Sequence, residues 1–432
     1  MAYYAIKWVR VSVCTMARDM ADGKAALDGL RVIDMTRVFA GPIAGQILGD
    51  LGADVIKVER PKVGDDGRAY GLAWVPGKDG LDTRLSSFFT ASNRNKRSIT
   101  VNHAKPEGAD IIRDLVKTAD VLIENYKVGD LKRFGLDYES LKAINPRLIY
   151  CSVTGFGQSG PMAARAGYDG LFQATGGMMA VTGIPDGQPG AGPLKAGPSL
   201  VDYMTGHNAA IAILGALVHR GRTGEGQFID IALLDSSVAM VSHIMQDYLI
   251  GGVAPPRFGN GGNGGGPADL IRCRDGTIYI SAGGDEHWRR LTVLMECPEL
   301  YEDERFDSIG KRAKLNRAEL IDIVNAWSSG FTVSDLQAMF DRAGIPAARY
   351  NDLPDVWEDP QVQYRGLRAT TPLAWAESGS VDLIASPLAH MSATPATIRY
   401  APPLIGEHTD EVLAEIGYDD AAIGRLRADS II

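Results

Sequence analysis

The stretch Leu30–Arg60, LRVIDMTRVFAGPIAGQILGDLGADVIKVER, decides the fold of this chain. Its first apolar run, LRVIDM, predicts a buried strand, and the turn TRVFAGP follows. IAGQILGDLGA then spaces its apolar residues as one face of a helix that ends at Gly52, and DVIKVER predicts the next strand. A strand, a helix and a second strand in this order predict a right-handed crossover within a parallel sheet.

The same alternation continues as far as Gly157. Further strands are expected near Ser98–Val101, in ADVLIENY (Ala119–Tyr126) and in RLIYCSVTGFG, with helices between them, one of which Pro106 opens as a first-turn proline. These units together predict an α/β fold with a doubly wound, Rossmann-like large domain.

A second, smaller α+β domain is expected downstream. DLIRCRDGTIYISAG predicts two strands joined by a turn at Asp275–Gly276. Three helical stretches follow, at Glu286–Met295, Arg317–Trp327 and Val333–Gly344. We divide the chain into an extension, either disordered or a start-site artefact (1–26), a large domain (27–225), a linker helix with a glycine loop (226–266), the small domain (267–351), and a return to the large domain (352–432).

Composition excludes several classes of protein. The 432 residues carry a net charge of −9, which argues against nonspecific binding to nucleic acid or to an anionic membrane. The longest apolar run, near Asn208–Val218, is too short to span a bilayer. The cysteines form no CxxC pair and the histidines no HxxxH pair, so we expect no metal site and reduced thiols in a cytoplasmic protein.

One glycine motif needs a separate interpretation. Gly155–Gly160, GFGQSG, fits the GxGxxG pattern after a strand, which would make the protein an NAD- or FAD-dependent oxidoreductase. The motif closes a series of βα units where a dinucleotide fingerprint opens the first one, and Pro161 follows it directly. A glycine turn that lines some other ligand fits better.

The glycine-rich stretch Gly167–Gly206 ends on one carboxylate, Asp202, before a small-residue helical run. Asp202 is either a helix N-cap or a nucleophile whose pocket the loop shapes. Cations stand at the predicted strand ends, where ligands of such sheets bind: Arg60, Lys62, Arg94, Lys96, Arg97, Lys127 and Arg133. Solvated surface charge explains most of them, and Arg60, directly after DVIKVE, is the best candidate for a phosphate contact.

Several of these segments together resemble the class III CoA-transferases, the CaiB/BaiF family typified by formyl-CoA transferase. The resemblance runs from Leu27 to the C-terminus and rests on these pieces: LDGLRVIDMTRVFAGP, GDLGADVIKVERP, NRNKRSITVN, ADVLIENY, NPRLIYCSVTGFGQSGP, GRTGEGQFIDIALLD and PLIGEHTDEVL. The family implies a large domain built from both chain ends, a small domain between them, and an interlocked homodimer. Asp202 falls where the family carries its catalytic aspartate.

The resemblance also implies the chemistry. An ionised aspartate, with an ordinary pKa of about 3.9, needs no base to attack an acyl-CoA thioester. The resulting anhydride becomes an aspartyl-CoA thioester, from which an incoming acid takes the CoA. No cofactor is bound permanently, because coenzyme A enters as substrate. Succinyl-CoA as donor and a dicarboxylic or branched acceptor fit, but the sequence does not decide them.

Other site residues are carried over by position. The supporting active-site residues are Tyr168, Asp169 and the end of a mobile glycine loop, Gly264, Gly265 and Gly266, whose alternative is a plain linker. The CoA contacts are Arg37, Val38, Phe39, Ala40, Arg60, Val101, Asn102, Asn125, Tyr126 and Arg133. Phe39 and Asp169 depart from the formyl-specific pattern, which puts formyl and oxalate specificity in doubt.

The same family contains α-methylacyl-CoA racemases, which are the second interpretation. Racemases need two proton-transfer groups, and their pattern has a histidine in GHD where this chain has Gly167-Tyr168-Asp169. A tyrosine, with a pKa of about 10, is a poor base for an α-proton at neutral pH. The sequence therefore favours the transferase over the racemase.

Overall fold

The computed structural model describes residues 25–262 and 264–432. Contacts between residues divide the chain into two compact units. Of the described residues, the first unit comprises 25–178, Ala196–Ser242 and Gln361–Ile432, and the second comprises Met179–Lys195 and His243–Pro360. The extension predicted at 1–26 lies almost wholly outside the described residues.

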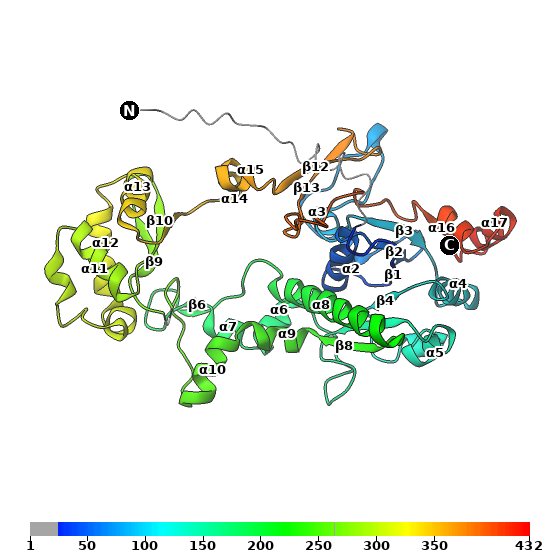
Figure 1. Ribbon diagram of the computed structural model, residues 1–432, viewed down its shortest axis with the longest axis horizontal. Helices are drawn as coiled ribbons and strands as arrows, with labels where there is room; N and C mark the ends of the chain where they lie inside the picture. The colour runs from blue at the N-terminus through cyan, green and yellow to red at the C-terminus, as the bar shows by residue number, and fades with distance from the viewer. Residues whose placement is uncertain (1–24, 263) are drawn as a thin grey trace. The chain divides into compact units, whose positions relative to one another are not determined.

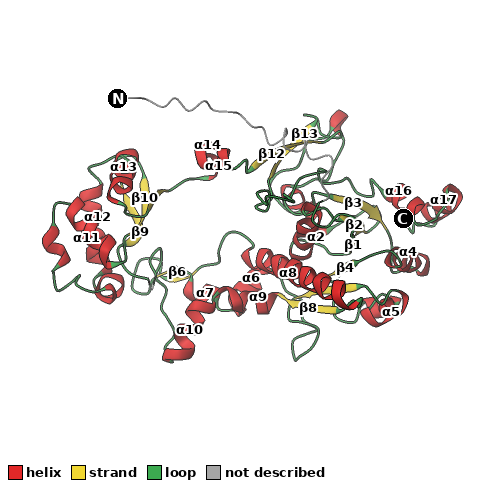
Figure 2. Ribbon diagram, in the orientation of Figure 1, coloured by secondary structure: helices red, strands yellow, loops and turns green. Residues whose placement is uncertain are grey.

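A six-stranded parallel sheet organises the first unit (Figures 1 and 2). Its strand order is β3-β2-β1-β4-β5-β8, which confirms the doubly wound α/β prediction. The strands are β1 (Arg31–Asp34), β2 (Asp54–Glu59), β3 (Lys96–Thr100), β4 (Val121–Glu124), β5 (Ile149–Thr154) and β8 (Phe228–Ala232). Strand β8 belongs to this sheet, although we placed 226–266 in a linker.

Each face of the sheet is covered by its own set of helices. Successive strand residues point to opposite faces, so Val32 of β1 packs under one set and Ile33 under the other. The first set is α2 (Ala40–Asp50), α8 (Leu200–Thr223) and α9 (Leu233–Met240). The second set is α4 (Pro106–Val116), α5 (Tyr138–Ile144), α16 (Thr409–Glu415) and α17 (Asp420–Ala428). The C-terminal helices, red in Figure 1, therefore complete a core that the N-terminal strands begin.

Shorter elements connect these parts. Helix α4 begins at Pro106 as predicted, and α2 begins three residues before the predicted Ile43 because Pro42 fits the first turn of a helix. The remaining elements of the first unit are η1 (Asp66–Ala69), η2 (Lys78–Gly80), α3 (Ser87–Thr90), η3 (Leu131–Phe134), α6 (Asp169–Thr175), and the hairpin of β12 (Arg368–Pro372) and β13 (Ser380–Ile384).

The second unit has a separate core. The antiparallel sheet β11-β10-β9 packs against three helices around Trp288 and Phe340. Its main elements confirm the two strands and three helices predicted there: β9 (Ala268–Arg272), β10 (Thr277–Ser281), α11 (Asp285–Leu294), α12 (Arg317–Ser328), α13 (Val333–Ala343) and β11 (Ala347–Arg349). Around them lie β6 (Gly183–Ile184), β7 (Gly192–Pro193), η4 (Pro298–Tyr301), a π-helical turn η5 (Lys311–Leu315) and α14 (Leu353–Glu358). Helices α7 (Met178–Val181), α10 (Ser242–Gly251) and α15 (Pro360–Tyr364) lie at the boundaries between the units.

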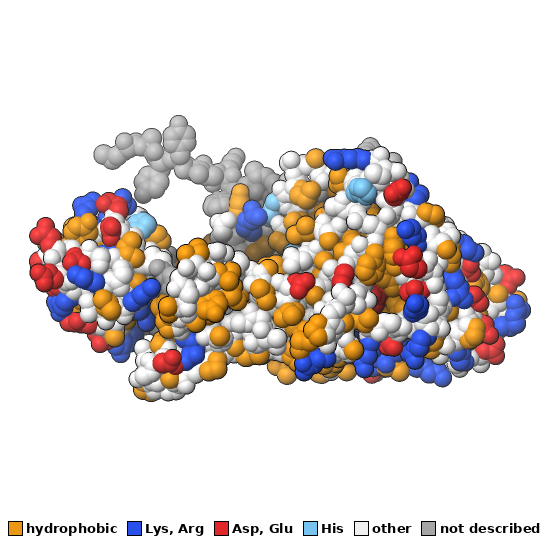
Figure 3. All heavy atoms as spheres, turned by 90° about the horizontal axis from the view of Figure 1, so that it is seen from below, with side chains coloured by type: hydrophobic (Ala, Val, Ile, Leu, Met, Phe, Trp, Pro, Cys, Tyr) orange, Lys and Arg blue, Asp and Glu red, His pale blue; other side chains and the backbone are white. Residues whose placement is uncertain are grey.

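The surface of the first unit mixes both signs of charge. On the face shown in Figure 3, acidic and basic side chains alternate over this unit without forming a large patch of one sign. Across 25–262 and 264–432, none of the helices combines the length and the hydropathy of a membrane span.

Candidate active site

The site lies at the point where the strand order of the large sheet reverses. A cavity of about 260 Å³ opens there at the carboxyl ends of β1, β4 and β5, which is where ligands of open α/β sheets bind. The turn after β1 contributes one wall, the segment after β4 a second, and the loop after β5 a third. Its polar and charged lining residues include Arg37, Asp66, Asn125, Tyr126, Lys127, Thr154, Arg165, Tyr168 and Asp202.

Asp202 lies in the first turn of α8 and lines this cavity. The capping alternative is wrong, because the N-cap of α8 is Ser199 and Asp202 is the third helical residue. The Asp202 residue is 9% exposed, and burial raises the pKa of its carboxyl to about 7, with the nearby Asp169 as a second cause. Loss of hydration makes a carboxylate a stronger nucleophile. With a pKa of about 7, however, about half of the Asp202 carboxyl groups are protonated at pH 7. The sequence alone did not predict this raised pKa.

Asp169 supports the start of α8 from the first turn of α6. Its Oδ1 accepts hydrogen bonds from the backbone N–H groups of Val201 (2.8 Å) and Asp202 (3.4 Å). Its Oδ2 accepts one from Nε2 of Gln173 at 2.6 Å. Asp169 thus satisfies donors at the helix start that would otherwise be unpaired, and it places a second negative charge beside Asp202.

Arg37 connects two walls of the cavity. Its backbone N–H donates to Oδ1 of Asn125 at 3.0 Å, and its carbonyl accepts from Nδ2 of Asn125 at 2.8 Å. The guanidinium lies 5.2 Å from the ring centroid of Tyr126 and 3.2 Å from Asp66. Its Nε is buried and has no hydrogen-bond partner among the described residues. The residue lines the cavity, where a guanidinium can donate to a bound anion.

Phe39, which lines the cavity, belongs to a cluster of aromatic rings. The Phe39 ring lies 4.6 Å from that of Phe88 and 5.0 Å, edge to face, from that of Tyr203, the neighbour of Asp202. Tyr70 contacts Phe88 in turn, at 5.6 Å. Tyr168 lines the cavity but is 67% exposed. An acyl group in the cavity would therefore meet Phe39, against whose ring Tyr203 packs.

The structure brings together part of the predicted set. Arg37, Val38, Phe39, Ala40, Asn125, Tyr126, Tyr168 and Asp202 all line the one cavity. Arg60, Val101, Asn102 and Arg133 lie outside its lining: Arg60 pairs with Asp66, Val101 is buried in the core, and Arg133 pairs with Asp130. Their contact with CoA stays a prediction.

The predicted glycine loop belongs to the second unit. A Cβ at Gly265 would lie 2.4 Å from the carbonyl oxygen of Gly283, and one at Gly266 would lie 2.7 Å from that of Arg312. Close backbone packing therefore requires these two glycines, whereas a Cβ at Gly264 would meet nothing within 4 Å. Their role in catalysis stays a prediction. Of the stretch Gly167–Gly206, Gly167, Tyr168 and Asp202 line the cavity, and residues 179–195 fold with the second unit.

Some lining residues were not singled out from the sequence. Arg165 and Leu233 follow β5 and β8, so the rule that ligands bind at the carboxyl ends of parallel strands could have found them. Asp66 had no local signal. GFGQSG follows β5 and leads into a loop, with α6 beginning only at Asp169, so it lacks the strand-to-helix geometry of a dinucleotide fingerprint. The described residues contain no group of three side chains that could hold a metal ion.

Comparison with known proteins decides the family. The family model described as CoA-transferase family III matches residues 27–409. The chain belongs to CoA-transferase family III. A succinate–glutarate CoA-transferase of Agrobacterium fabrum is 43% identical over 399 residues, which cover 92% of this chain and 97% of that protein. The succinyl-CoA:glutarate CoA-transferase of Homo sapiens is 37% identical over 407 residues, covering 94% of this chain and 90% of that protein.

A solved structure supports the same assignment. The crystal structure of a CAIB/BAIF family protein from Brucella suis superposes with a TM-score of 0.80 at 41% identity, covering 91% of this chain and all of that one. The present protein is therefore an enzyme of the CoA-transferase type, and CoA thioesters are its substrates.

Proposed function

We propose that this enzyme moves CoA from a dicarboxylic acyl-CoA to a free carboxylic acid through covalent intermediates on Asp202. The observation that carries the proposal is the buried Asp202 carboxylate, which lines the cavity and makes no side-chain hydrogen bond that would occupy its oxygens among the described residues. Water-poor surroundings favour attack by the carboxylate and protect an anhydride and a thioester from hydrolysis.

The steps balance without a cofactor. One Asp202 oxygen attacks the thioester carbonyl, a mixed anhydride forms, and CoA leaves as a thiolate. The thiolate attacks the aspartyl carbonyl, which gives an aspartyl-CoA thioester and releases the donor acid with one oxygen taken from Asp202. An acceptor carboxylate then attacks the aspartyl thioester, and the released thiolate attacks the acceptor carbonyl of the new anhydride. Asp202 is restored with one oxygen from the acceptor.

The cations of the cavity suit substrates with two kinds of negative charge. Arg37, Lys127 and Arg165 line it, and of these only Arg37 has an ion pair among the described residues. Cations so placed can bind phosphate oxygens of CoA or the distal carboxylate of a dicarboxylic acid. The names of the relatives support succinate as donor acid and glutarate as acceptor, and related enzymes act on mesaconate and malate.

Trapping tests this function directly. Enzyme incubated with succinyl-CoA and quenched with hydroxylamine should carry a hydroxamate on the peptide that contains Asp202, and Asp202→Asn should carry none while retaining CoA affinity. A hydroxamate at another residue, or transfer at the wild-type rate by Asp202→Asn, would refute the covalent route. The racemase interpretation predicts exchange of the α-proton of a 2-methylacyl-CoA in heavy water without an acceptor acid, and we expect none.

The assembly and the location are also part of the proposal. The family resemblance leads us to expect an interlocked homodimer with a large domain built from both chain ends, in a cytoplasmic protein. Sedimentation of the purified protein at several concentrations tests the dimer, and a single species with the mass of one chain would contradict it.

A further inference from the structure

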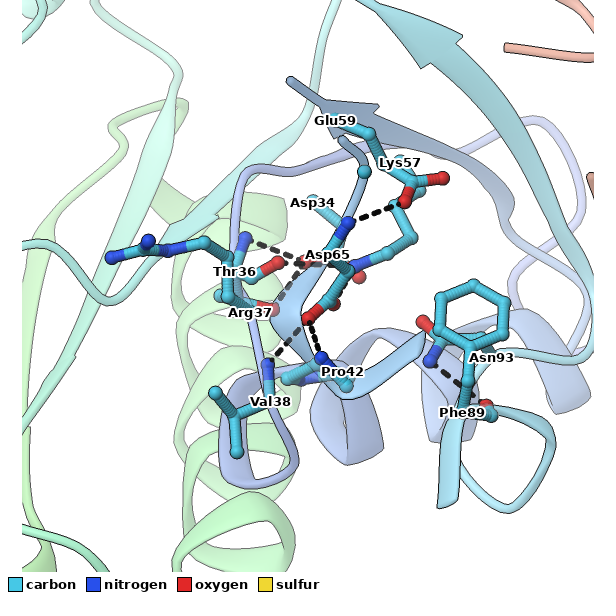
Figure 4. Close-up of polar contacts among 12 residues, drawn as sticks. Asp34, Thr36, Arg37, Val38, Pro42, Lys57, Glu59, Asp65, Phe89 and Asn93 are labelled. Carbon is cyan, nitrogen blue, oxygen red and sulfur yellow. Dashed lines mark hydrogen bonds and ion pairs between the residues drawn. The ribbon is translucent and has the colours of Figure 1, made fainter. Parts of the chain in front are cut away.

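Two buried lysines, Lys57 and Lys96, bind the turn that forms one wall of the cavity. Figure 4 shows Lys57 beside Asp65. Lys57 comes from β2 and Lys96 from β3, and neither side chain is exposed. Each forms an ion pair of 2.8 Å with a carboxylate that is equally buried, Lys57 with Asp65 and Lys96 with Asp34. Four buried charges in one small volume are unusual, because each costs solvation free energy.

These four side chains, called the lysine–carboxylate cluster below, bind the backbone of the turn after β1, residues 36–42. Nζ of Lys57 donates to the carbonyl of Thr36 at 3.0 Å, and Nζ of Lys96 donates to that of Pro42 at 2.8 Å. Oδ1 of Asp65 accepts from the backbone N–H of Val38 at 2.9 Å. Oδ1 of Asp34 accepts from the backbone N–H of Thr36 at 2.9 Å. The cluster therefore holds both ends and the middle of the turn.

The middle of the turn is a strained residue. Val38 has φ +72°, in the left-handed region that a β-branched side chain rarely adopts. Such a conformation persists only where its surroundings impose it, and the hydrogen bond from Val38 to Asp65 does so here. Asp65 is fixed in turn by Lys57 and by its bond to the backbone N–H of Gly67 at 2.8 Å.

The conformation of the turn bears on the nucleophile. Phe39 and Ala40 follow Val38, and the Phe39 ring contacts Tyr203, the neighbour of Asp202. A Cβ at Gly206 would lie 2.6 Å from the carbonyl oxygen of Ala40, so the turn rests directly on α8 one helical turn after Asp202. Rotation at Val38 would move the wall that faces the substrate and would disturb its packing on α8.

We propose that Lys57 and Asp65 are positioning residues that hold Val38 in its left-handed conformation and thereby fix the Arg37–Ala40 wall of the active-site cavity. Asp34 and Lys96 anchor the two ends of the same turn. Hydrophobic residues often replace a buried ion pair without loss of stability, so the charges are better explained by the backbone geometry they impose. This inference rests on CoA transfer at this cavity.

Four variants test it, with succinyl-CoA and glutarate as substrates and calorimetry of CoA binding. Asp65→Ala removes the acceptor of the Val38 N–H, and we expect kcat/KM and CoA affinity to fall at least about tenfold, since a 1 Å misplacement can cost about 100-fold. Asp65→Asn retains an acceptor oxygen and should restore most of both. Val38→Gly should rescue Asp65→Ala, because glycine adopts the left-handed conformation without strain. Val38→Gly alone provides the kinetic constants against which the double variant is compared.

The rescue separates positioning from a purely structural role. Glycine at position 38 does not restore the lost ion pair, so the urea midpoint of Asp65→Ala should stay low while kcat/KM recovers. Asp50→Ala is the matched control, because Asp50 forms an equally buried ion pair with Arg94 (2.5 Å) away from the turn. It should lower the midpoint and leave kcat and KM unchanged.

Two results would overturn the inference: unchanged kinetic constants in Asp65→Ala, or no recovery in the double variant. If Asp65→Ala does not fold, Lys57→Met/Asp65→Leu removes both charges and should show the same kinetic loss and the same rescue. Failure of this inference can be distinguished from failure of the proposed function. If Asp202 is the nucleophile, Asp65→Ala should still form the hydroxamate on Asp202 in a single turnover. Asp202→Asn should form no hydroxamate although it binds CoA with full affinity.

Discussion

The buried Asp202 carboxylate predicts a specific dependence of stability on pH. Its pKa is about 7 in the folded protein and 3.8 as the ordinary value. The folded state therefore binds a proton more tightly than the unfolded state, so stability is fully present below pH 3.8 and is lost as the pH rises through 7. At 1.36 kcal/mol per pH unit, the whole penalty is about 4 kcal/mol, of which about 2.5 kcal/mol develops between pH 5 and pH 8.

Replacement by asparagine isolates this contribution. Asp202→Asn keeps the shape of the side chain and cannot ionise, so its free energy of unfolding lacks this dependence. Between pH 5 and pH 8, we expect the variant to gain about 2.5 kcal/mol relative to the wild type in urea unfolding. Glu124 also has a pKa raised to about 7 by burial, but it is present in both proteins and cancels in the comparison.

The pH dependence of the kinetics tests the pKa of Asp202 independently. Since only the ionised carboxylate attacks the thioester, kcat/KM of the wild type should rise with pH and level off above a midpoint near 7. If the stability difference between wild type and Asp202→Asn were the same at pH 5 and pH 8, Asp202 would not be desolvated as described, and the reasoning from burial to reactivity would fail.

Three further substitutions test the site and its packing. Asp169→Asn should shift the acidic limb of the pH profile of kcat/KM to lower pH, because it removes the second cause of the raised pKa of Asp202; an unchanged midpoint would contradict this. Arg37→Met should raise KM for acyl-CoA at least about tenfold through loss of a charge-assisted hydrogen bond, whereas Arg147→Met, at the opposite end of β5, should leave KM unchanged. Gly206→Ala should destabilise the protein by about 1–3 kcal/mol in urea unfolding, because its Cβ would lie 2.6 Å from the carbonyl oxygen of Ala40. Gly215→Ala in the same helix, where a Cβ meets nothing within 4 Å, should stabilise by about 0.5–1 kcal/mol, and equal effects of the two would refute the packing argument.

The local sequence patterns predicted the helices and strands well, because each helix or strand has its own periodic spacing of apolar residues. The strand-turn-helix-strand unit of Leu30–Arg60 and the strands and helices of the small unit follow from apolar spacing and from turn residues. The family resemblance assigned Arg37, Asn125 and Tyr126 to one site, and they do line one cavity. They meet there because the carboxyl ends of parallel strands share one edge of a sheet.

The buried lysines could not be predicted in the same way. Lys96 was grouped with the surface cations, but it is 1% exposed, and burial lowers its pKa to about 8 against the opposing effect of Asp34. Its partner, Asp34, lies on another strand, 62 residues earlier in the sequence. The local sequence pattern does not indicate that these two residues pair. The one available signal was Lys57 in the middle of DVIKVE, where a strand that is buried on both faces has no exposed position for a charge.

Oxygen exchange tests the covalent route through Asp202 most directly. After a single turnover with succinyl-CoA and glutarate labelled with oxygen-18 in both carboxylates, the aspartyl route leaves one heavy oxygen in the Asp202 side chain, and repeated turnover replaces the second oxygen as well. Fragmentation of the isolated peptide locates the label there. Enzyme given the labelled acid without succinyl-CoA should gain none. Complete transfer of CoA with no label in Asp202 would contradict the account.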